Sequence, residues 1–238
     1  MLITLLSLLS SVKIGSYEHF LPILFAVVFT FILIKWAKTI AVDMKTRVFK
    51  GLGAFVTLTV IAYHIYLVLT TDYIISTDLP LFLCSFLGLI IVIFTQYRTY
   101  WMYEILLFWV FAGTTQAILT PDIATGFPAF NFFRYWIVHL GLITIMLYAT
   151  VVFRMRPTIK SVFKSFVVLQ IYMVIMLIIN KLLGSNYSYL NRKPTSASAL
   201  DYLGDWPEYI VVVEVLLIPY FLLIYLPFYI IDKRKSKR

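Results

Sequence analysis

Long apolar runs separated by short polar connections dominate this chain. A helix that crosses the hydrocarbon layer of a membrane needs about 20 mostly apolar residues. Seven runs approach that length, so the pattern predicts an all-α, polytopic membrane protein with a seven-transmembrane helix bundle. The runs cover residues 20–37, 52–70, 79–95, 101–119, 132–153, 162–183 and 209–231. Because they use most of the chain, we expect residues 1–238 to form a single transmembrane helical domain.

The composition agrees with this pattern. Of the 238 residues, 62% are hydrophobic and 13% are charged, which excludes an ordinary soluble domain. The one cysteine, Cys84, excludes a disulfide within the chain, and no CxxC or HExxH spacing indicates a metal site, so we expect no metal and no other cofactor. The apolar run over residues 1–12 is too short to span, which favours an interfacial or re-entrant segment over a signal peptide.

The net charge of +9 is distributed unevenly. With seven spans, 15 of the 20 Lys and Arg residues fall on one side of the membrane, including those of a tail over residues 232–238. Basic connections face the cytoplasm. The rule therefore predicts a multi-pass protein of the cell membrane with its N-terminus outside and a basic cytoplasmic tail. This placement favours membrane phospholipids as partners, and no nucleic acid is expected.

Polar side chains within the apolar runs fall toward one end of the predicted bundle. An ionisable or hydrogen-bonding group costs several kcal/mol in hydrocarbon unless it is paired or reaches water. Counted at about 1.5 Å per residue, these groups lie within roughly 5 to 12 Å of the outer boundary. Their shared depth marks a candidate site in the outer leaflet. The residues are His64, Cys84, Gln116, His139, Asn180 and Glu214.

Cys84 and His139 are the pair most readily linked to covalent chemistry. A thiol is a poor nucleophile until it is deprotonated, and a neighbouring imidazole accepts the proton and stabilises the thiolate. Such a pair can attack an ester carbonyl, so both residues are predicted to be catalytic. The alternative is structural, because a buried cysteine usually acts as a small hydrophobic side chain and a membrane histidine is often a packing residue.

Four further residues are predicted to support or orient this pair. His64 offers a second base, and Glu214 offers a carboxylate that can fix a histidine tautomer. Gln116 and Asn180 offer amide donors for an oxyanion. The alternative for each is a hydrogen bond that only joins helices. Gln116 is expected to face the bundle with the other members of its helical stripe, which are Trp109, Gly113 and Thr120.

Groups suited to a lipid headgroup lie at the outer ends of the runs. Arg134 lies at the start of the fifth run. Its guanidinium can form a bidentate hydrogen bond with a phosphate, or it can extend into the headgroup layer without a specific ligand. The connection over residues 184–208 is the longest, and its Asn186 and Arg192 are also predicted to contact a headgroup. Its length and aromatic residues favour an extracellular capping loop over a solvated linker.

Four segments carry a resemblance to known proteins. LPLFLCSF at residues 79–86, GTTQAILTPDI at 113–123, RYWIVH at 134–139 and GSNYSYLNRKP at 184–194 resemble the bacterial YwaF-type integral membrane family. More distantly, the chain is similar to the eukaryotic transmembrane-protein-164 family. That resemblance implies a phospholipid acyltransferase whose catalytic Cys and His match Cys84 and His139. Many relatives carry a histidine close to the Cys, and here that support must come from His139 or His64.

These observations lead to one function and two rivals. The leading hypothesis is an acyltransferase or acyl hydrolase that acts on phospholipid esters at the outer leaflet through Cys84 and His139. The first rival is a non-enzymatic protein that binds or transports a lipid or small solute in the same polar pocket. The second is a scaffold whose polar cluster only fixes helix packing. The sequence does not decide the oligomeric state.

Overall fold

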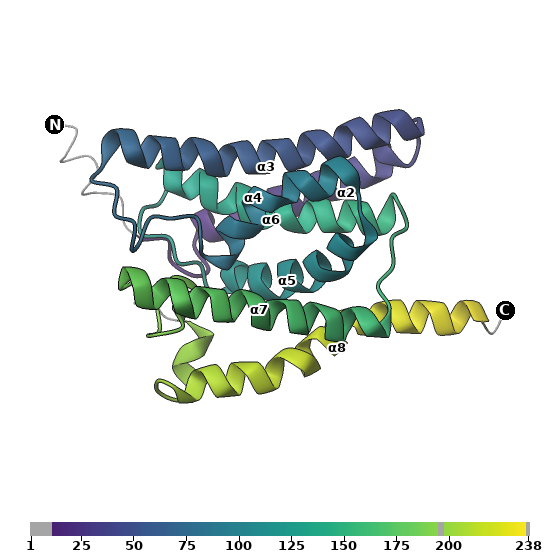
Figure 1. Ribbon diagram of the computed structural model, residues 1–238. Helices are drawn as coiled ribbons and strands as arrows, with labels where there is room; N and C mark the ends of the chain where they lie inside the picture. Colours follow the sequence, from purple (N-terminus) through teal and green to yellow (C-terminus); the bar gives the residue numbers. More distant parts are fainter. Residues whose placement is uncertain (1–10, 195–197, 237–238) are drawn as a thin grey trace.

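The computed structural model describes residues 11–194 and 198–236, so most of the apolar run over residues 1–12 and the last two residues of the basic tail lie outside it. The described residues form α-helices and two short 3-10 helices and contain no β-strand (Figure 1). The α-helices are α2 (Tyr17–Ala37), α3 (Val42–Thr70), α4 (Leu83–Tyr97), α5 (Tyr100–Leu119), α6 (Phe130–Val151), α7 (Ile159–Leu183) and α8 (Glu208–Ser236), and the 3-10 helices are η1 (Tyr187–Tyr189) and η2 (Ala199–Tyr202).

Six of the described helices are long and apolar enough to cross a membrane. The prediction of an all-helical, multi-pass membrane protein is therefore confirmed, whereas the count of seven spans is not. The remaining helix, α4, has 15 residues and is about 22 Å long, which falls short of a hydrocarbon layer of about 30 Å. The seventh span and the sidedness of the bundle stay predictions.

The third apolar run does not begin as a helix. Residues 79–82 form turns, and α4 begins only at Leu83. Pro80 explains the delay, because proline lacks a backbone N–H and disfavours the helical conformation of the residue before it. The consequence is that Cys84 lies in the first turn of its helix, rather than about five residues inside it.

Helix α3 shows the opposite deviation, because it begins before its apolar run. The run was expected to start at residue 52, and the helix starts at Val42. The added turns are polar, and Arg47 forms an ion pair with Asp43 one turn earlier. Helical pairs of this spacing stabilise an exposed turn, so the helix extends past the part that the apolar pattern reveals.

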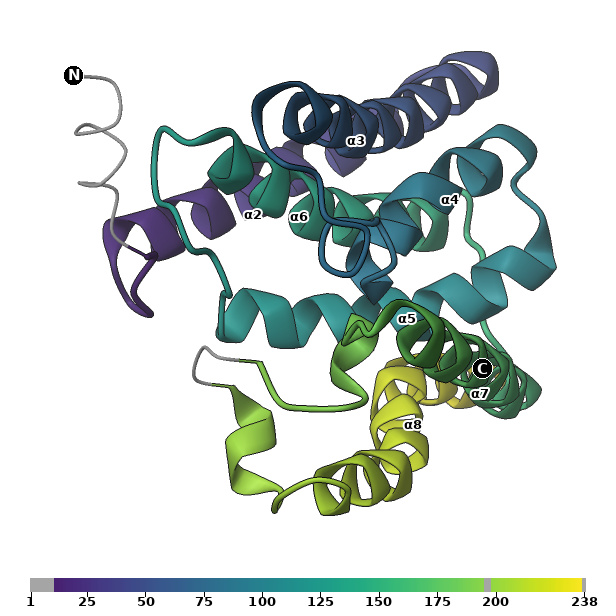
Figure 2. The same cartoon turned by 60° about the vertical axis from the view of Figure 1, so that its left-hand side comes forward.

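Helices α5 and α6 form the centre of the bundle. In their most apolar windows 56% and 61% of residues are buried, against 11% in α2 and α8. Helix α6 packs against α2, α3, α4 and α5, whereas α7 packs against α5 and α8. Figure 2 shows α5 between α3 on one side of the bundle and α7 and α8 on the other. The peripheral helices therefore present most of their apolar surface outward.

Glycines allow α3, α4 and α6 to approach closely. A Cβ atom on Gly53 of α3 would lie 1.9 Å from Oγ1 of Thr95 on α4. On Gly141 of α6 it would lie 2.6 Å from the side chain of Val56 on α3. Thr57 adds a hydrogen bond of 2.7 Å from its hydroxyl to the carbonyl of Gly88. Small residues at helix contacts are the common means of association in membranes, and here they fix the register of three helices.

The packing predicts a contrast between two glycines on α3. Gly53→Val places a branched side chain against Thr95, whereas nothing lies within 4 Å of a Cβ atom on Gly51. Overpacking costs about 1–3 kcal/mol or more, so Gly53→Val should lower the melting temperature in detergent by several degrees. Gly51→Val is the matched control and should change it little. Equal melting temperatures for the two variants would contradict the close contact.

Candidate functional site

The register of three helices brings His64, Cys84 and Arg134 to one level of the bundle. Helices α3 and α4 run antiparallel, with Gly53 against Thr95 and Val60 against Gly88. His64 lies one turn after Val60 on α3, and Cys84 lies one turn before Gly88 on α4. His64 and Cys84 are therefore at the same level of the bundle. Helix α6 runs parallel to α4, because Val138 approaches Gly88 and Arg134 bonds to Ser85. This level lies at the end of the bundle where the connections at 71–82 and 184–207 are found (Figure 1).

Cys84 is the second residue of α4 and is partly buried. The preceding cap residue, Phe82, offers no side-chain hydrogen bond. Within the described chain, the backbone N–H groups of Leu83, Cys84 and Ser85 have no acceptor, and the first helical bond comes from Phe86. Such a helix end favours negative charge. A thiolate at this position, or an oxyanion beside it, would therefore face free donors.

A glycine keeps space open beside the thiol. A Cβ atom on Gly113 of α5 would lie 4.0 Å from Sγ of Cys84 and 3.3 Å from the side chain of Leu83. A side chain at this position would therefore press on Leu83 and meet the thiol at ordinary contact distance. The prediction that Gly113 faces the bundle is confirmed by this contact.

Arg134 supplies a positive charge without a carboxylate partner. Its guanidinium donates to Oδ1 of Asn131 at 2.8 Å and to Oγ of Ser85 at 3.4 Å. Its Cζ atom lies 4.6 Å from the ring centroid of Tyr63. Nε is buried without a partner, and no Asp or Glu of the described chain pairs with Arg134. A cation held by neutral groups leaves its charge available to an anion.

His139 is buried on α6 in a defined tautomer. Its Nδ1 lies 2.7 Å from the carbonyl oxygen of Tyr135, so Nδ1 carries the proton and donates it to that bond. The ring of Tyr135 lies over the imidazole with centroids 4.1 Å apart. Nε2 is then an acceptor, and no described residue donates to it. This is the state that a general base requires.

The structure does not show the predicted pair of Cys84 and His139. No hydrogen bond joins the thiol to either His139 or His64 in the described chain. By the register of α4 and α6, His139 lies five residues beyond the level of Arg134, which is roughly 7 to 8 Å deeper. The direct contact therefore stays a prediction, and a proton would have to cross this offset.

Tyr135 links His139 to the loop that follows α5. The hydroxyl of Tyr135 donates to the carbonyl of Ala117 at 2.7 Å and accepts from the N–H of Asp122 at 3.3 Å. The carboxylate of Asp122 accepts a bond of 3.1 Å from the hydroxyl of Tyr189 in η1. Burial and then Asp122 raise the pKa of Tyr189, so its hydroxyl keeps its proton. Sequence reasoning assigned no role to these three residues, although Tyr135 lies one helical turn before His139.

The first part of the connection over 184–208 covers the segment that leads to Cys84. The hydroxyl of Tyr187 accepts from the N–H of Leu79 at 3.0 Å and donates to the carbonyl of Ile75. The ring of Phe82 packs against those of Tyr187 and Tyr189, with centroids 5.3 Å apart in each pair. Residues 184–194, called the cap below, therefore pack against residues 75–82. The extracellular capping loop over residues 184–208 stays a prediction.

The side chain of Asn180 anchors this cap. Its Oδ1 accepts from the N–H of Tyr187 and from Oγ of Ser185, each at 2.7 Å. Its Nδ2 donates to the carbonyl of Tyr187 at 2.9 Å. Its oxygen and one amide hydrogen are therefore used within the cap, and a supporting role for the other amide hydrogen stays a prediction.

Asn186 and Arg192 contribute to the cap in different ways. Oδ1 of Asn186 accepts from the N–H groups of Asn191 and Arg192 at 2.9 and 3.1 Å, and its Nδ2 donates to the carbonyl of Arg192. The amide of Asn186 thus closes a turn, and its predicted headgroup role stays a prediction. The side chain of Arg192 is exposed and bonds to no described residue, so its headgroup role stays a prediction.

Two other predicted supporting residues lie elsewhere. Gln116 is exposed, and its side chain bonds to no described residue, so the expectation that it faces the bundle is wrong. Glu214 on α8 accepts from Nε2 of Gln170 on α7 at 2.7 Å. The described chain does not form the bond from a histidine to Glu214, so the orienting role of Glu214 stays a prediction. Helix α8 packs against α5 and α7. His64 is on α3 and His139 is on α6, so the carboxylate of Glu214 lies away from both rings.

A buried carboxylate at the opposite end of the bundle was missed. Glu104 on α5 is 4% exposed, accepts from Oγ of Ser161 at 2.6 Å and forms an ion pair with Lys164. A carboxylate one turn inside an apolar run is unusual, and this feature of the sequence could have identified Glu104 as a buried residue. The polar groups of the bundle are therefore not confined to one end. Among the described residues, no three His, Cys, Asp or Glu side chains gather to hold a metal ion.

The anchoring role of Asn180 predicts a local loss of structure. Asn180→Ala removes three side-chain bonds and leaves the buried N–H and carbonyl of Tyr187 without partners. Each unpaired buried group costs about 1–3 kcal/mol. We expect a lower melting temperature and faster proteolytic cleavage within residues 184–208. Lys181→Ala alters the exposed neighbour and serves as the control. Unchanged cleavage in Asn180→Ala would contradict this role.

Comparisons with known proteins place the chain in a family. The model of the TMEM164 family matches residues 14–225, which includes every α-helix of the described structure except the end of α8. Comparisons with curated proteins and with solved structures give no match. The resemblance to the bacterial YwaF-type family is not confirmed by these comparisons. The match over most of the sequence shows that this chain belongs to the TMEM164 family.

Proposed function

We propose that this protein is a membrane-embedded acyltransferase that acts on phospholipid acyl esters through Cys84, and an acyl hydrolase where water is the acceptor. One observation carries the proposal. The thiol of Cys84 stands at the uncapped N-terminus of α4, beside the guanidinium of Arg134 that has no carboxylate partner. Family membership supports it, because the resemblance to this family implies acyl transfer by a Cys and a His at these positions.

The first half of the reaction forms a thioester. The phosphate of the lipid binds Arg134, which sets the ester near Cys84. The thiol proton passes to Nε2 of His139, directly or through one water, and Sγ attacks the ester carbonyl. The free N–H groups of Leu83, Cys84 and Ser85 stabilise the oxyanion. The C–O bond then breaks, and the lysolipid leaves with the proton from His139.

The second half of the reaction returns the enzyme to its starting state. The hydroxyl of an acceptor lipid, or water, gives its proton to Nε2 of His139 and attacks the thioester carbonyl. The C–S bond breaks, the new ester or free acid leaves, and the proton returns to the sulfur of Cys84. The positive N-terminal end of α4 and the charge of Arg134 oppose the cost that burial imposes on the thiolate in both halves. The two half-reactions balance in atoms and charge without an oxidant, a metal or a cofactor.

The distribution of basic residues supports an outer-leaflet position for this reaction. Lys45, Arg98 and Arg154 lie at the helix ends opposite to Cys84. Basic connections favour the cytoplasm, so the end that carries Cys84 faces the outside. The cap over residues 184–194 then lies on the extracellular side.

A chemical prediction tests the catalytic roles. Purified protein is incubated with phospholipid and lysolipid, and the products are measured by mass spectrometry. Cys84→Ala should abolish turnover, and His139→Gln should reduce it by about 10²–10⁴, the usual contribution of a general base. His19→Gln is the matched control, because the ring of His19 only bonds to Ile118 and Gly15. Turnover retained in both site variants would refute the proposal.

A binding prediction tests the role of Arg134. Loss of a charged hydrogen-bonding partner costs about 1.5–3 kcal/mol, so Arg134→Gln should raise KM for a phospholipid by about 10- to 100-fold. KM for a diacylglycerol, which has no phosphate, should not change. Lys181→Gln, on the exposed end of α7, controls for loss of a surface charge. An equal effect of Arg134→Gln on both substrates would contradict phosphate binding.

A second function is favoured by the lack of contact between Cys84 and His139. The Arg134 site alone could hold a lipid headgroup without reaction, which makes the protein a non-enzymatic lipid-binding or transport protein. Phosphate-dependent binding to Cys84→Ala, together with no turnover in the unmodified chain, would favour this alternative over catalysis.

A further inference from the structure

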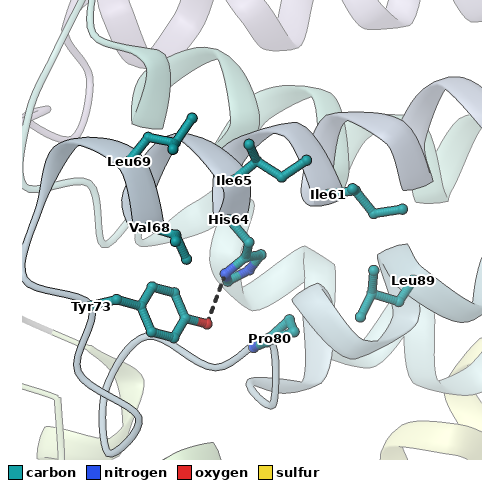
Figure 3. A pocket seen from close by; sticks show the side chains of 8 residues that line it. All are labelled: Ile61, His64, Ile65, Val68, Leu69, Tyr73, Pro80 and Leu89. Carbon is teal, nitrogen blue, oxygen red and sulfur yellow. Dashed lines mark hydrogen bonds between the residues drawn. The ribbon is translucent and has the colours of Figure 1, made fainter.

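A groove separates α3 from the connection before α4. It has a volume of about 340 Å³, near the lower end of the range of about 300–1,000 Å³ for ligand sites. It opens onto the outward apolar surface, where Ile65 is 54% and Leu69 is 77% exposed. Figure 3 shows side chains of α3 on one side and of the connection and α4 on the other. The lining residues are Ile61, His64, Ile65, Val68, Leu69, Tyr73, Pro80 and Leu89.

His64 and Tyr73 are the ionisable side chains of this lining, and they contact each other. The hydroxyl of Tyr73 donates its one proton to the carbonyl of Asp78 at 2.9 Å, and burial raises the pKa of Tyr73, so that proton is kept. The contact of 3.4 Å between this hydroxyl and Nδ1 of His64 (Figure 3) is favourable only if Nδ1 carries the proton. Nε2 of His64 is therefore a bare acceptor.

That acceptor has no partner. Nε2 of His64 is buried and receives no hydrogen bond within residues 11–194 and 198–236. A buried acceptor that stays unpaired is costly, and the groove in which it lies faces the region of the bilayer. The molecule that can satisfy it must be apolar enough to enter from the membrane and must carry a hydrogen-bond donor.

We propose that this groove binds a single-chain lipid alcohol, with the hydrocarbon chain along α3 and the hydroxyl donated to Nε2 of His64. A lysophospholipid or monoacylglycerol has this combination. A diacylphosphatidylcholine brings ester and phosphate oxygens, which only accept hydrogen bonds, and a choline group without an N–H, so it would leave Nε2 unpaired. The apolar lining and the volume suit one chain.

The wall of the groove opposite α3 permits entry. Tyr73 and Pro80 lie on the connection over residues 71–82, not on a helix. A connection changes its conformation more readily than a packed helix. A small displacement of Tyr73 therefore exposes Nε2 of His64 to a hydroxyl in the groove. Because His64 is level with Cys84 across the contact of α3 and α4, the bound lipid lies beside the proposed reaction site.

Ligand pairs test the proposal without relying on catalysis. The Cys84→Ala chain in nanodiscs is titrated with a lysophosphatidylcholine that carries a photoreactive acyl chain, and with its analogue in which the free hydroxyl is a methoxy group. We expect the hydroxyl lipid to bind about three- to tenfold more tightly, the effect of one hydrogen bond. Photolabelling should fall within residues 61–73 and 80–89. Equal affinities, or labelling elsewhere, would overturn the proposal.

Variants separate the acceptor from the groove. His64→Phe removes the acceptor, so the preference for the hydroxyl lipid should disappear while the methoxy analogue still binds. His64→Gln restores an acceptor oxygen and should recover part of the preference. Ile65→Trp fills the groove and should weaken both ligands, whereas Leu58→Trp lies outward on the same helix and should not. A preference that persists in His64→Phe also overturns the proposal.

The result is independent of the proposed function. If the hydroxyl preference depends on His64 but no acyl transfer occurs in the unmodified chain, the groove is a binding site and the catalytic proposal fails. If acyl transfer depends on Cys84 but the two ligands bind equally, the catalytic proposal stands and the groove assignment fails.

Discussion

The close contact of α3 with α4 and α6 is the constraint on which the rest of this bundle depends. Gly53 and Gly141 allow backbone to approach side chain where any Cβ atom would clash, and Thr57 bonds across the contact. In a membrane there is no hydrophobic force between helices, so such packing supplies much of the association. It also sets the register that brings His64, Cys84 and Arg134 to one level, and a shift of one turn would separate them.

The polar groups of the bundle divide into those that are satisfied and those that are not. Asn180, Asn186 and Glu214 have hydrogen-bond partners in the described chain. Nε of Arg134, Nε2 of His64 and the first N–H groups of α4 have none in the described chain. Buried groups without partners are costly and uncommon. The chemistry proposed for this protein uses the second set, because those groups are free to bind a ligand.

The cap stores conformational strain beside the site. Ser188 and Tyr189 have φ values of 58° and 55° in succession, a conformation that costs roughly 1–2 kcal/mol per residue for side chains other than glycine. Hydrogen bonds hold it, from Tyr189 to Asp122 and from Tyr209 to the carbonyl of Tyr189. Together with the ring contact between Phe82 and Tyr189, they join the connections after α5 and α7 to the segment before α4. The position of Cys84 therefore depends on residues distant from it in the sequence.

The apolar pattern by itself determined that this is an all-helical membrane protein, and the residue types marked Cys84, His139 and Arg134 as candidates. Hydrophobicity along a chain reports which residues enter the membrane and at what depth. It does not report which way a side chain faces, so Gln116 was expected inside and is exposed, and Glu104 was overlooked. Only the tertiary structure decided these points, because whether a polar group is paired or free depends on the neighbouring helix that the packing places against it.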